Sequence, residues 1–308
     1  MLDGLSIGHV TRGDTGVTVI YCGPEGALAS GDVRGGGPGT RETDLLEPAN
    51  TVERVHAVVL AGGSAFGLAA ADGVMQELAD AHIGFPVFGP DRPGPRVPIV
   101  PGAVIFDLIV GETVPTAADG RAACQNALRE SSMAEGNVGA GAGATAGKLR
   151  GGFGIGRAQA GDHEVAAAVV CNPVGEVVDA RTGRLFGAPE RAPIDVEALA
   201  ALPAPEAHLN TTIGVVATTA PITKAQAKRL AMSSHDGIAR AVRPSHLPLD
   251  GDTLFALSTA TEPTGLDPEV LTAVCAAGEE AVACAIVHAV CAADPGYGWQ
   301  SYSNLGAQ

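Results

Sequence analysis

The sequence predicts an α/β protein, built as a layered sandwich of strands and helices. Its predicted strands are mostly continuous apolar runs, as in sheets that are covered on both faces. Strands and helices also mix on both sides of a proline-bearing linker at residues 188–210. The segment after Asn210 holds too few strands to close a core alone, so we expect residues 1–308 to form a single domain.

The first part of the chain predicts two strands, a third buried strand and a helix. Residues 17–22 (VTVIYC) are an apolar strand, and residues 27–33 are expected to pair with it as a hairpin. Residues 56–61 (HAVVLA) are a buried strand that ends at Gly62-Gly63-Ser64. The apolar spacing over residues 67–81 then predicts a helix.

A proline-rich segment interrupts this pattern. Six prolines in residues 86–101 predict a long loop without regular structure, at the surface or at an interface. A strand over residues 103–110 and a helix over residues 117–129 follow. Residues 136–156 contain nine glycines, which predicts closely packed loops.

The second half of the chain repeats strands and helices. The strand over residues 163–171 ends at Asn172-Pro173-Val174-Gly175, a sequence typical of turns. After the linker, the expected elements are a strand at 213–218, a helix at 224–242, a strand at 253–258 and a long helix at 268–292.

Composition and charge exclude several function classes. The net charge is −15 and the pI is about 4.8, so the basic surface of a nucleic-acid-binding protein is missing. The most apolar stretch, residues 281–293, is too short to span a membrane. The six cysteines lie in apolar runs without a CxxC pair, and the N-terminus has no signal-peptide pattern. We therefore expect a soluble cytoplasmic protein with reduced thiols.

Motifs for cofactors and metals are also incomplete. Lys148 follows a Gly/Ala-rich loop, but Leu149 replaces the Ser or Thr of a phosphate loop. Ser64 lies in a glycine-rich turn that lacks the second glycine of a nucleophile elbow, because Phe66 occupies that position. The histidines show no HExxH spacing. We expect neither a cofactor nor a metal ion.

The tripeptide Asn210-Thr211-Thr212 carries the most chemistry. It ends the linker and opens an apolar strand. If the bond before Thr211 were cut, its hydroxyl would be a nucleophile and its freed α-amine a base. An α-amine has a pKa of ~7.7–8.0, closer to neutrality than the ~10.4 of a lysine. Cleavage there would give chains 1–210 and 211–308.

Four further residues could support this chemistry. Acyl transfer develops negative charge on a carbonyl oxygen, which a Lys148 cation and an Asn172 amide could stabilise. Asp250 and Asp252 are two residues apart, so in an extended segment both would point to one face and could hold the amine and orient the hydroxyl. From the residues alone, all of them can equally be ordinary strand, turn and loop residues.

The chain also resembles the L-aminopeptidase/D-esterase family of N-terminal-nucleophile hydrolases, which includes β-peptidyl aminopeptidases and nylon-oligomer hydrolases. The matching stretches run in order and together are specific: TRETD from Thr40, LAGGSAFGL from Leu60, VPIVPGAVIFDL from Val97, GNVGAGAGATAGK from Gly136, NPVG from Asn172, NTTIGVVAT from Asn210, SSHDGIARA from Ser233 and DGDTLFALST from Asp250.

This resemblance implies a four-layer αββα sandwich that cuts itself between Asn210 and Thr211. Thr211 matches the nucleophile of the family. Lys148 and Asn172 match residues that stabilise the oxyanion, and Asp250 and Asp252 match residues that position the nucleophile. The threonine with two aspartates resembles the nylon-oligomer hydrolase branch most.

One position departs from the family pattern. Some members carry a tyrosine where this chain has Phe106, and a phenyl ring donates no hydrogen bond. Activity toward difficult amides is therefore in question.

The resemblance implies an aminopeptidase or amidase for small peptides or amide oligomers, with nylon-type 6-aminohexanoate oligomers among its candidate substrates. It also implies a homo-oligomer, such as a tetramer of processed αβ units. Two alternatives remain: an acyl transferase similar to ornithine acetyltransferases, and an uncleaved, non-catalytic scaffold protein.

Overall fold

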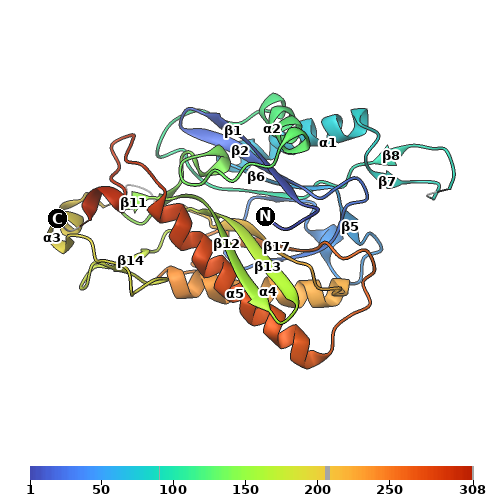
Figure 1. Ribbon diagram of the computed structural model, residues 1–308. Coiled ribbons are helices and arrows are strands. Elements are labelled where there is room, and N and C mark those ends of the chain that lie inside the picture. Colours follow the sequence, from blue (N-terminus) through green and yellow to red (C-terminus); the bar gives the residue numbers. More distant parts are fainter. Residues whose placement is uncertain (90, 205–208, 307–308) are drawn as a thin grey trace.

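The protein is a four-layer αββα sandwich, as the family resemblance implies. The computed structural model describes residues 1–89, 91–204 and 209–306. Two sheets lie face to face, and one pair of helices covers the outer face of each sheet (Figure 1). Three separate clusters of buried apolar side chains fill the spaces between these four layers.

The first sheet has five strands and lies beneath two helices. All its neighbouring strands are antiparallel except β6 and β9, which are parallel. Helices α1 (Ala70–Asp80) and α2 (Ala117–Arg129) cover its outer face (Figure 1). The strand order is β1 (Ser6–Arg12), β2 (Thr15–Tyr21), β6 (Ala57–Ala61), β9 (Gly102–Val104) and β4 (Thr40–Arg41).

The second sheet has six strands, and its outer face packs against α4 (Lys224–Ala241) and α5 (Pro268–Cys291). Only β16 and β17 are a parallel pair, and they lie at its centre. The strand order is β12 (Gly152–Ala160), β13 (His163–Cys171), β16 (Ile213–Thr218), β17 (Thr253–Ser258), β3 (Ala27–Val33) and β5 (Arg54–Val55).

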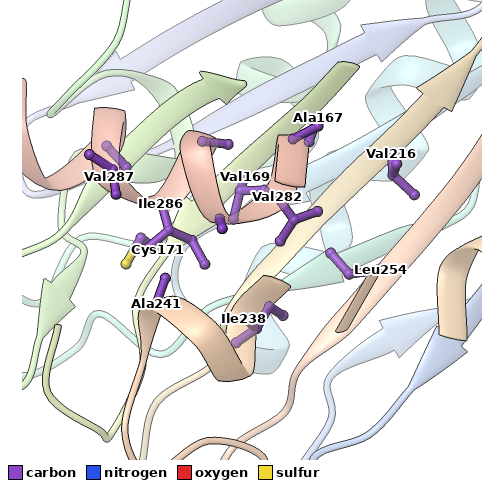
Figure 2. Packing of buried hydrophobic residues seen from close by; sticks show 14 of the residues in the cluster. Ala167, Val169, Cys171, Val216, Ile238, Ala241, Leu254, Val282, Ile286 and Val287 are labelled. Carbon is purple, nitrogen blue, oxygen red and sulfur yellow. The ribbon is translucent and has the colours of Figure 1, made fainter. Parts of the chain in front are cut away.

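Strand β16 shows how the continuous apolar runs fill two cores at once. Because side chains alternate along a strand, Ile213 and Val215 face the other sheet, whereas Val216 faces the helices. Figure 2 shows the helix side of this arrangement, where Val216 and Leu254 of the sheet lie near α4 and α5. A strand that is buried on both faces explains the absence of polar alternation in the sequence.

The ends of the helices follow their capping residues. Thr116 and Asp119 form a reciprocal capping box at the start of α2, and Thr223 with Gln226 does the same for α4. Pro268 occupies the first turn of α5, where its missing N–H is not needed. The predicted helices at 117–129, 224–242 and 268–292 are confirmed to within one residue.

Several local predictions were wrong. The predicted hairpin between residues 17–22 and 27–33 does not form, because β1 and β6 occupy both edges of β2. Strand β3 pairs instead with β17 and β5 in the other sheet. The strand predicted at 103–110 ends at Val104, and residues 108–110 form a turn.

Two segments predicted to lack regular structure contain short elements. The proline-rich segment holds an antiparallel pair, β7 (Phe85–Pro86) and β8 (Arg96–Val97). The linker contains α3 (Val196–Ala201), which begins because Asp195 accepts N–H groups of its first turn. The remaining short elements are β10 (Thr145–Ala146), β11 (Leu149–Arg150), β14 (Val178–Asp179), β15 (Arg184–Leu185) and 3₁₀ turns at Asp44–Leu46, Ser64–Ala69, Gly139–Gly141 and Ser303–Leu305.

Helix α5 is long and apolar enough to cross a membrane by length and composition. Half of its most apolar window is buried in this structure, where the helix packs on β12 and β13. A core helix of a layered protein has the same composition, and this is the role that the structure describes.

A buried carboxyl group joins three loops at one end of the first sheet. Asp107 is 2% exposed and accepts hydrogen bonds from the Thr15 hydroxyl (2.7 Å) and the Gly63 N–H (2.6 Å). Burial raises its pKa from 3.8 to about 6, although both hydrogen bonds oppose this change. The fold therefore favours the protonated acid relative to the unfolded chain.

We predict that Asp107→Asn removes the contribution of this carboxyl group to the pH dependence of the free energy of unfolding. Since the folded pKa is the higher one, stability is full below about pH 4 and falls as the pH rises toward about 6. The change in the free energy of unfolding from about pH 4 to about pH 7 should become more positive by up to about 3 kcal/mol, because the asparagine has no proton to lose. Urea unfolding across this range measures it, with exposed Asp162→Asn as the control. An unchanged pH dependence would contradict the prediction.

Candidate functional site

The parallel pairing of β16 and β17 brings two predicted motifs together. Residues 210–212 lead into β16, and residues 250–252 lead into β17. Asn210 and Asp250 form a parallel bridge just before the paired strands begin. The Thr253 N–H donates to the Thr212 carbonyl (3.0 Å), which continues the ladder. Asn210, Thr211 and Asp250 therefore share one buried end of the second sheet.

The peptide bond before Thr211 has an unusual environment. The Thr211 hydroxyl donates to the Asn210 carbonyl oxygen at 2.6 Å, and the Gly251 N–H donates to the same oxygen at 3.2 Å. On the other side of the bond, the Thr211 N–H donates to the Asn172 carbonyl at 2.7 Å. Both ends of this peptide group are thus fixed beside a hydroxyl.

The Asn210 side chain holds the residue before this bond. Its Nδ2 donates to the Pro173 carbonyl (2.8 Å) and lies 3.5 Å from the Thr145 hydroxyl oxygen. Its Oδ1 is buried and has no hydrogen-bond partner among the described residues. A buried acceptor without a hydrogen-bond partner costs free energy. This acceptor belongs to the residue that precedes Thr211.

Asp252 accepts a hydrogen bond from Thr212, the residue that follows Thr211. One of its oxygens accepts the Thr212 N–H (2.8 Å), and the other accepts the His246 N–H (3.2 Å) and lies 2.7 Å from His246 Nδ1. Asp252 is almost fully buried, so these donors replace the water that would otherwise solvate its carboxylate.

Asp250 is held by two backbone groups from different loops. It accepts the N–H groups of Val174 (3.1 Å) and Leu247 (2.8 Å). Burial raises the pKa of Asp250, the charge of Asp252 raises it further, and the two N–H donors lower it. The two aspartates both accept from residues 246–247, so the structure brings them together as the sequence predicts.

Asn172 reaches Thr211 through its backbone rather than its amide. Its side-chain Nδ2 donates to the Phe106 carbonyl (3.1 Å), and its Oδ1 accepts the Thr145 N–H (2.8 Å). Both polar ends of the amide are therefore occupied in the uncut chain. The turn at 172–175 serves to fix the Asn172 carbonyl against the Thr211 N–H.

The structure does not bring the Lys148 ammonium to the Asn210 carbonyl. Lys148 lies in the turn between β10 and β11, and its Nζ donates to the Leu202 carbonyl at 3.1 Å. Among the described residues, the hydrogen bonds to the Asn210 carbonyl come from Thr211 and Gly251. Lys148 instead lines a neighbouring cavity.

Two cavities lie along the same pair of chain segments. A cavity of about 210 Å³ contains Thr211, Asn210 and Phe106 in its wall, and a cavity of about 700 Å³ contains Lys148. Residues 104–106 and 209–211 line the smaller cavity. Residues 108–109 and 202–204 line the larger cavity. The larger cavity also presents Tyr297, Trp299 and Gln300.

Four residues of this region were missed by the sequence reasoning. Gly251 lies between the two aspartates, and its backbone N–H is invisible to side-chain patterns. The Thr145 N–H donates to the side-chain oxygen of Asn172 at 2.8 Å. Glu176 accepts the Lys148 N–H at 3.4 Å. Burial raises the pKa of Glu176, while Lys148 lowers it. His246 carries no motif, and only its place in the fold reveals it.

Within the part of the chain that the structure describes, no group of three or more His, Cys, Asp or Glu side chains is arranged to hold a metal ion.

Comparisons with known proteins identify the family of the chain. The family model described as peptidase family S58 matches residues 2–302. An uncharacterized aminopeptidase of Mycobacterium leprae is 44% identical, over 99% of this chain and 92% of its own length. A 6-aminohexanoate-oligomer endohydrolase of a Kocuria species is 33% identical, over 83% of this chain and 73% of its own length.

Two solved structures share the fold. A β-aminopeptidase from a Burkholderia species superimposes with a TM-score of 0.74 at 22% identity, covering 99% of this chain and 90% of its own. The L-aminopeptidase D-Ala-esterase/amidase of Ochrobactrum anthropi, described as a variant of the Ntn hydrolase fold, gives a TM-score of 0.73 at 22% identity, with coverages of 95% and 85%. The chain therefore belongs to peptidase family S58 and is a hydrolase.

Proposed function

We propose that this hydrolase cuts its own chain between Asn210 and Thr211 and then uses Thr211 as an N-terminal nucleophile on amide substrates. One observation carries the proposal. The Thr211 hydroxyl and the Gly251 N–H converge on the Asn210 carbonyl, in a buried site that excludes bulk water. A hydroxyl beside a polarised carbonyl is the arrangement that intramolecular acyl transfer needs.

In the first step, Thr211 Oγ1 attacks the carbonyl carbon of Asn210. The C–O bond forms as the C–N bond breaks, and the hydroxyl proton moves to the departing nitrogen. The Gly251 N–H already donates to the carbonyl oxygen and would stabilise the negative charge that develops there. Before attack, the hydroxyl must rotate away from its 2.6 Å hydrogen bond to that oxygen, so that a lone pair faces the carbon.

Water then hydrolyses the ester. The products are the carboxyl group of Asn210 and a free hydroxyl and α-amine on Thr211. The Asn172 carbonyl, which accepts the Thr211 N–H at 2.7 Å before the cut, would hold the new amine afterwards. Asp252 would fix the Thr212 N–H, and with it the position of the nucleophile. Asp250 would support the same end of the sheet through Val174.

In the cut enzyme, the α-amine would take the proton of the Thr211 hydroxyl as it attacks a substrate carbonyl. We assign oxyanion stabilisation in this second reaction to Lys148 and Asn172. Lys148 is bound to Leu202 in the uncut chain, and Leu202 precedes the proposed cut. Cleavage would let this segment withdraw and free the Lys148 ammonium. Phe106 offers only its backbone carbonyl, which accepts and does not donate.

The fold would keep the two pieces together. Residues 211–308 contribute β16, β17, α4 and α5, and residues 1–210 contribute every strand that flanks the central pair. Strand β16 pairs with β13 on one side, and β17 pairs with β3 on the other. Separation would break both ladders and open two apolar cores, so we propose one domain of two associated chains.

The proposed substrates are short peptides or amide oligomers. Relatives are named aminopeptidases and 6-aminohexanoate-oligomer endohydrolases. The cavity of about 700 Å³ has apolar walls at Leu108, Ile109 and Trp299, next to the Lys148 ammonium. Such a wall suits a substrate with an extended apolar chain between its amide groups, and 6-aminohexanoate oligomers have that chemistry.

We propose a cytoplasmic homo-oligomer that binds neither nucleic acid nor membranes. The six cysteines are free thiols, and the net charge of −15 repels nucleic acid. An arm made of β7, β8 and their connecting residues projects from the body (Figure 1). It exposes four large apolar side chains, which contact with a second copy would bury. The four apolar residues are Phe85, Val87, Phe88 and Val97.

Replacing Thr211 by Ala tests the proposed nucleophile. The unaltered protein should yield chains of 1–210 and 211–308, and Thr211→Ala should remain one chain of 308 residues without amidase activity. Thr211→Ser keeps the hydroxyl and is the matched control, which should still be cut. Denaturing intact-mass analysis gives the result. Cleavage of the alanine variant at the same bond would refute the mechanism.

Gly251→Ala should slow self-cleavage about 100-fold, because small displacements of reacting groups have effects of that size. An added Cβ would lie 2.8 Å from the Thr211 hydroxyl oxygen and 2.7 Å from the Gly37 carbonyl oxygen, so one of them must move. Gly306→Ala is the control, because its nearest atom would be 3.7 Å away. Equal rates of fragment formation in both variants would exclude Gly251 from the site.

Phe88→Asp should reduce the oligomer to smaller species while leaving the fold intact, because it places a charge among the exposed apolar side chains that the proposed interface would bury. Sedimentation velocity measures the assembly, and circular dichroism measures the fold. Glu130→Gln, an exposed change on the surface of the first helical layer, is the control. The same sedimentation coefficient for all three proteins would show that the arm is not an interface.

A further inference from the structure

His246 has a backbone conformation that places two N–H groups on the buried aspartates. Its φ is +57°, in the left-handed region that a side chain with a Cβ rarely adopts. The N–H groups of His246 and Leu247 consequently point to Asp252 Oδ2 (3.2 Å) and Asp250 Oδ2 (2.8 Å). Successive N–H groups in such a turn form a concave site for negative charge.

The His246 ring adds a third contact to the same pair. Its Nδ1 lies 2.7 Å from Asp252 Oδ2, and an ionised carboxylate only accepts hydrogen bonds, so Nδ1 carries a proton. The other oxygen of Asp252 binds the Thr212 N–H. A continuous chain of contacts therefore runs from the His246 ring through Asp252 to the residue next to Thr211.

The His246 ring lies between the two aspartates and a second histidine. Asp252 and Asp250 lie on one side. On the other side, His235 packs edge to face against it, with ring centroids 5.0 Å apart. Burial lowers the pKa of His235 to about 4, so His235 is neutral near neutral pH. Behind His235 lie Asp32, whose carbonyl oxygen is 3.1 Å from its Nε2, and Arg34, which pairs with Asp32.

We propose that His246 is a positioning residue for the reaction of Thr211: its ring N–H and its backbone N–H hold Asp252 Oδ2, so that the other oxygen of Asp252 stays on the Thr212 N–H. The inference rests on the proposed self-cleavage. Two buried carboxylates next to each other repel, and donors in contact with one of them offset that repulsion. Without the ring N–H, Asp252 loses one of its three donors, and its contact with Thr212 loosens.

The proposal makes a comparison between two variants. His246→Asn retains a side-chain N–H that can reach Asp252 and tolerates the left-handed conformation. It should cut itself at a rate close to that of the unaltered chain. His246→Ala lacks the side-chain donor and should cut itself about 10-fold more slowly.

The measurement uses the full chain made by cell-free synthesis and transferred to one buffer at neutral pH. Intact mass then follows the conversion of 308 residues into the two fragments. His82→Asn is the matched control, because His82 is also a left-handed histidine (φ +57°) but is exposed and distant in sequence from the site. Equal rates for all variants, or an asparagine variant as slow as the alanine variant, would overturn the role of His246.

A second readout separates this failure from failure of the proposed function. In the uncut Thr211→Ala chain, the His246 Nδ1 proton should give an NMR signal protected from solvent exchange, and Asp252→Asn should abolish or shift it. If that signal is present but the unaltered chain never cuts itself, the self-cleavage proposal is wrong and His246 has no reaction to position. If cutting occurs and the signal is absent, only the His246 proposal fails.

Discussion

The parallel pairing of β16 and β17 is the constraint on which the rest of the site depends. Because the two strands run in the same direction, the segments that precede them meet at one end of the sheet. Two motifs that are about 40 residues apart in the chain thereby share one set of hydrogen bonds. An antiparallel pair would have placed Thr211 and Asp252 at opposite ends of the sheet, and no local sequence change could have compensated for that.

Because this end of the sheet is buried, each hydrogen bond between its polar groups matters for stability. Thr211 is 5% exposed and Asp250 is fully buried, so water cannot replace a contact that is lost. Each carboxylate oxygen of Asp250 and Asp252 has a donor, as buried charge requires. Among the described residues of this end, Asn210 Oδ1 and Thr212 Oγ1 are buried without a partner, and they lie on either side of Thr211. The site thus combines a rigid frame with two unsatisfied groups.

Much of the fold could be predicted because its signals are local. Continuous apolar runs predicted the central strands, and apolar spacing predicted a helix after Gly62-Gly63-Ser64. The starts of α2 and α4 also carry capping boxes, which are local signals. The partner of β3 could not be predicted, because the choice between two sheets depends on contacts with residues far along the chain. Strand β9 ends early because Asp107 and its loop contacts replace the ladder, which an apolar run does not reveal.

The parts of the site that depend on the type of side chain could be predicted from the sequence. Asn210, Thr211, Asp250 and Asp252 are together in the structure, as the spacing and the resemblance implied. The orientations were not predictable: Asn172 uses its carbonyl, and Lys148 binds Leu202. Gly251 contributes a backbone group, and His246 depends on a single left-handed residue in a loop. Backbone donors and loop conformations leave little trace in a sequence.

The central position of β16 has a consequence for how long a cut molecule survives. In the intact precursor, β13 and β16 belong to one covalent chain, so their pairing is an intramolecular event. If the bond before Thr211 is broken as proposed, an unfolded molecule would become two separate polymers that must find each other and interleave strands in the right order. Refolding would then depend on concentration and compete with aggregation of exposed apolar strands. The working lifetime of the cut protein would therefore be set by its rate of unfolding rather than by an equilibrium between folded and unfolded forms.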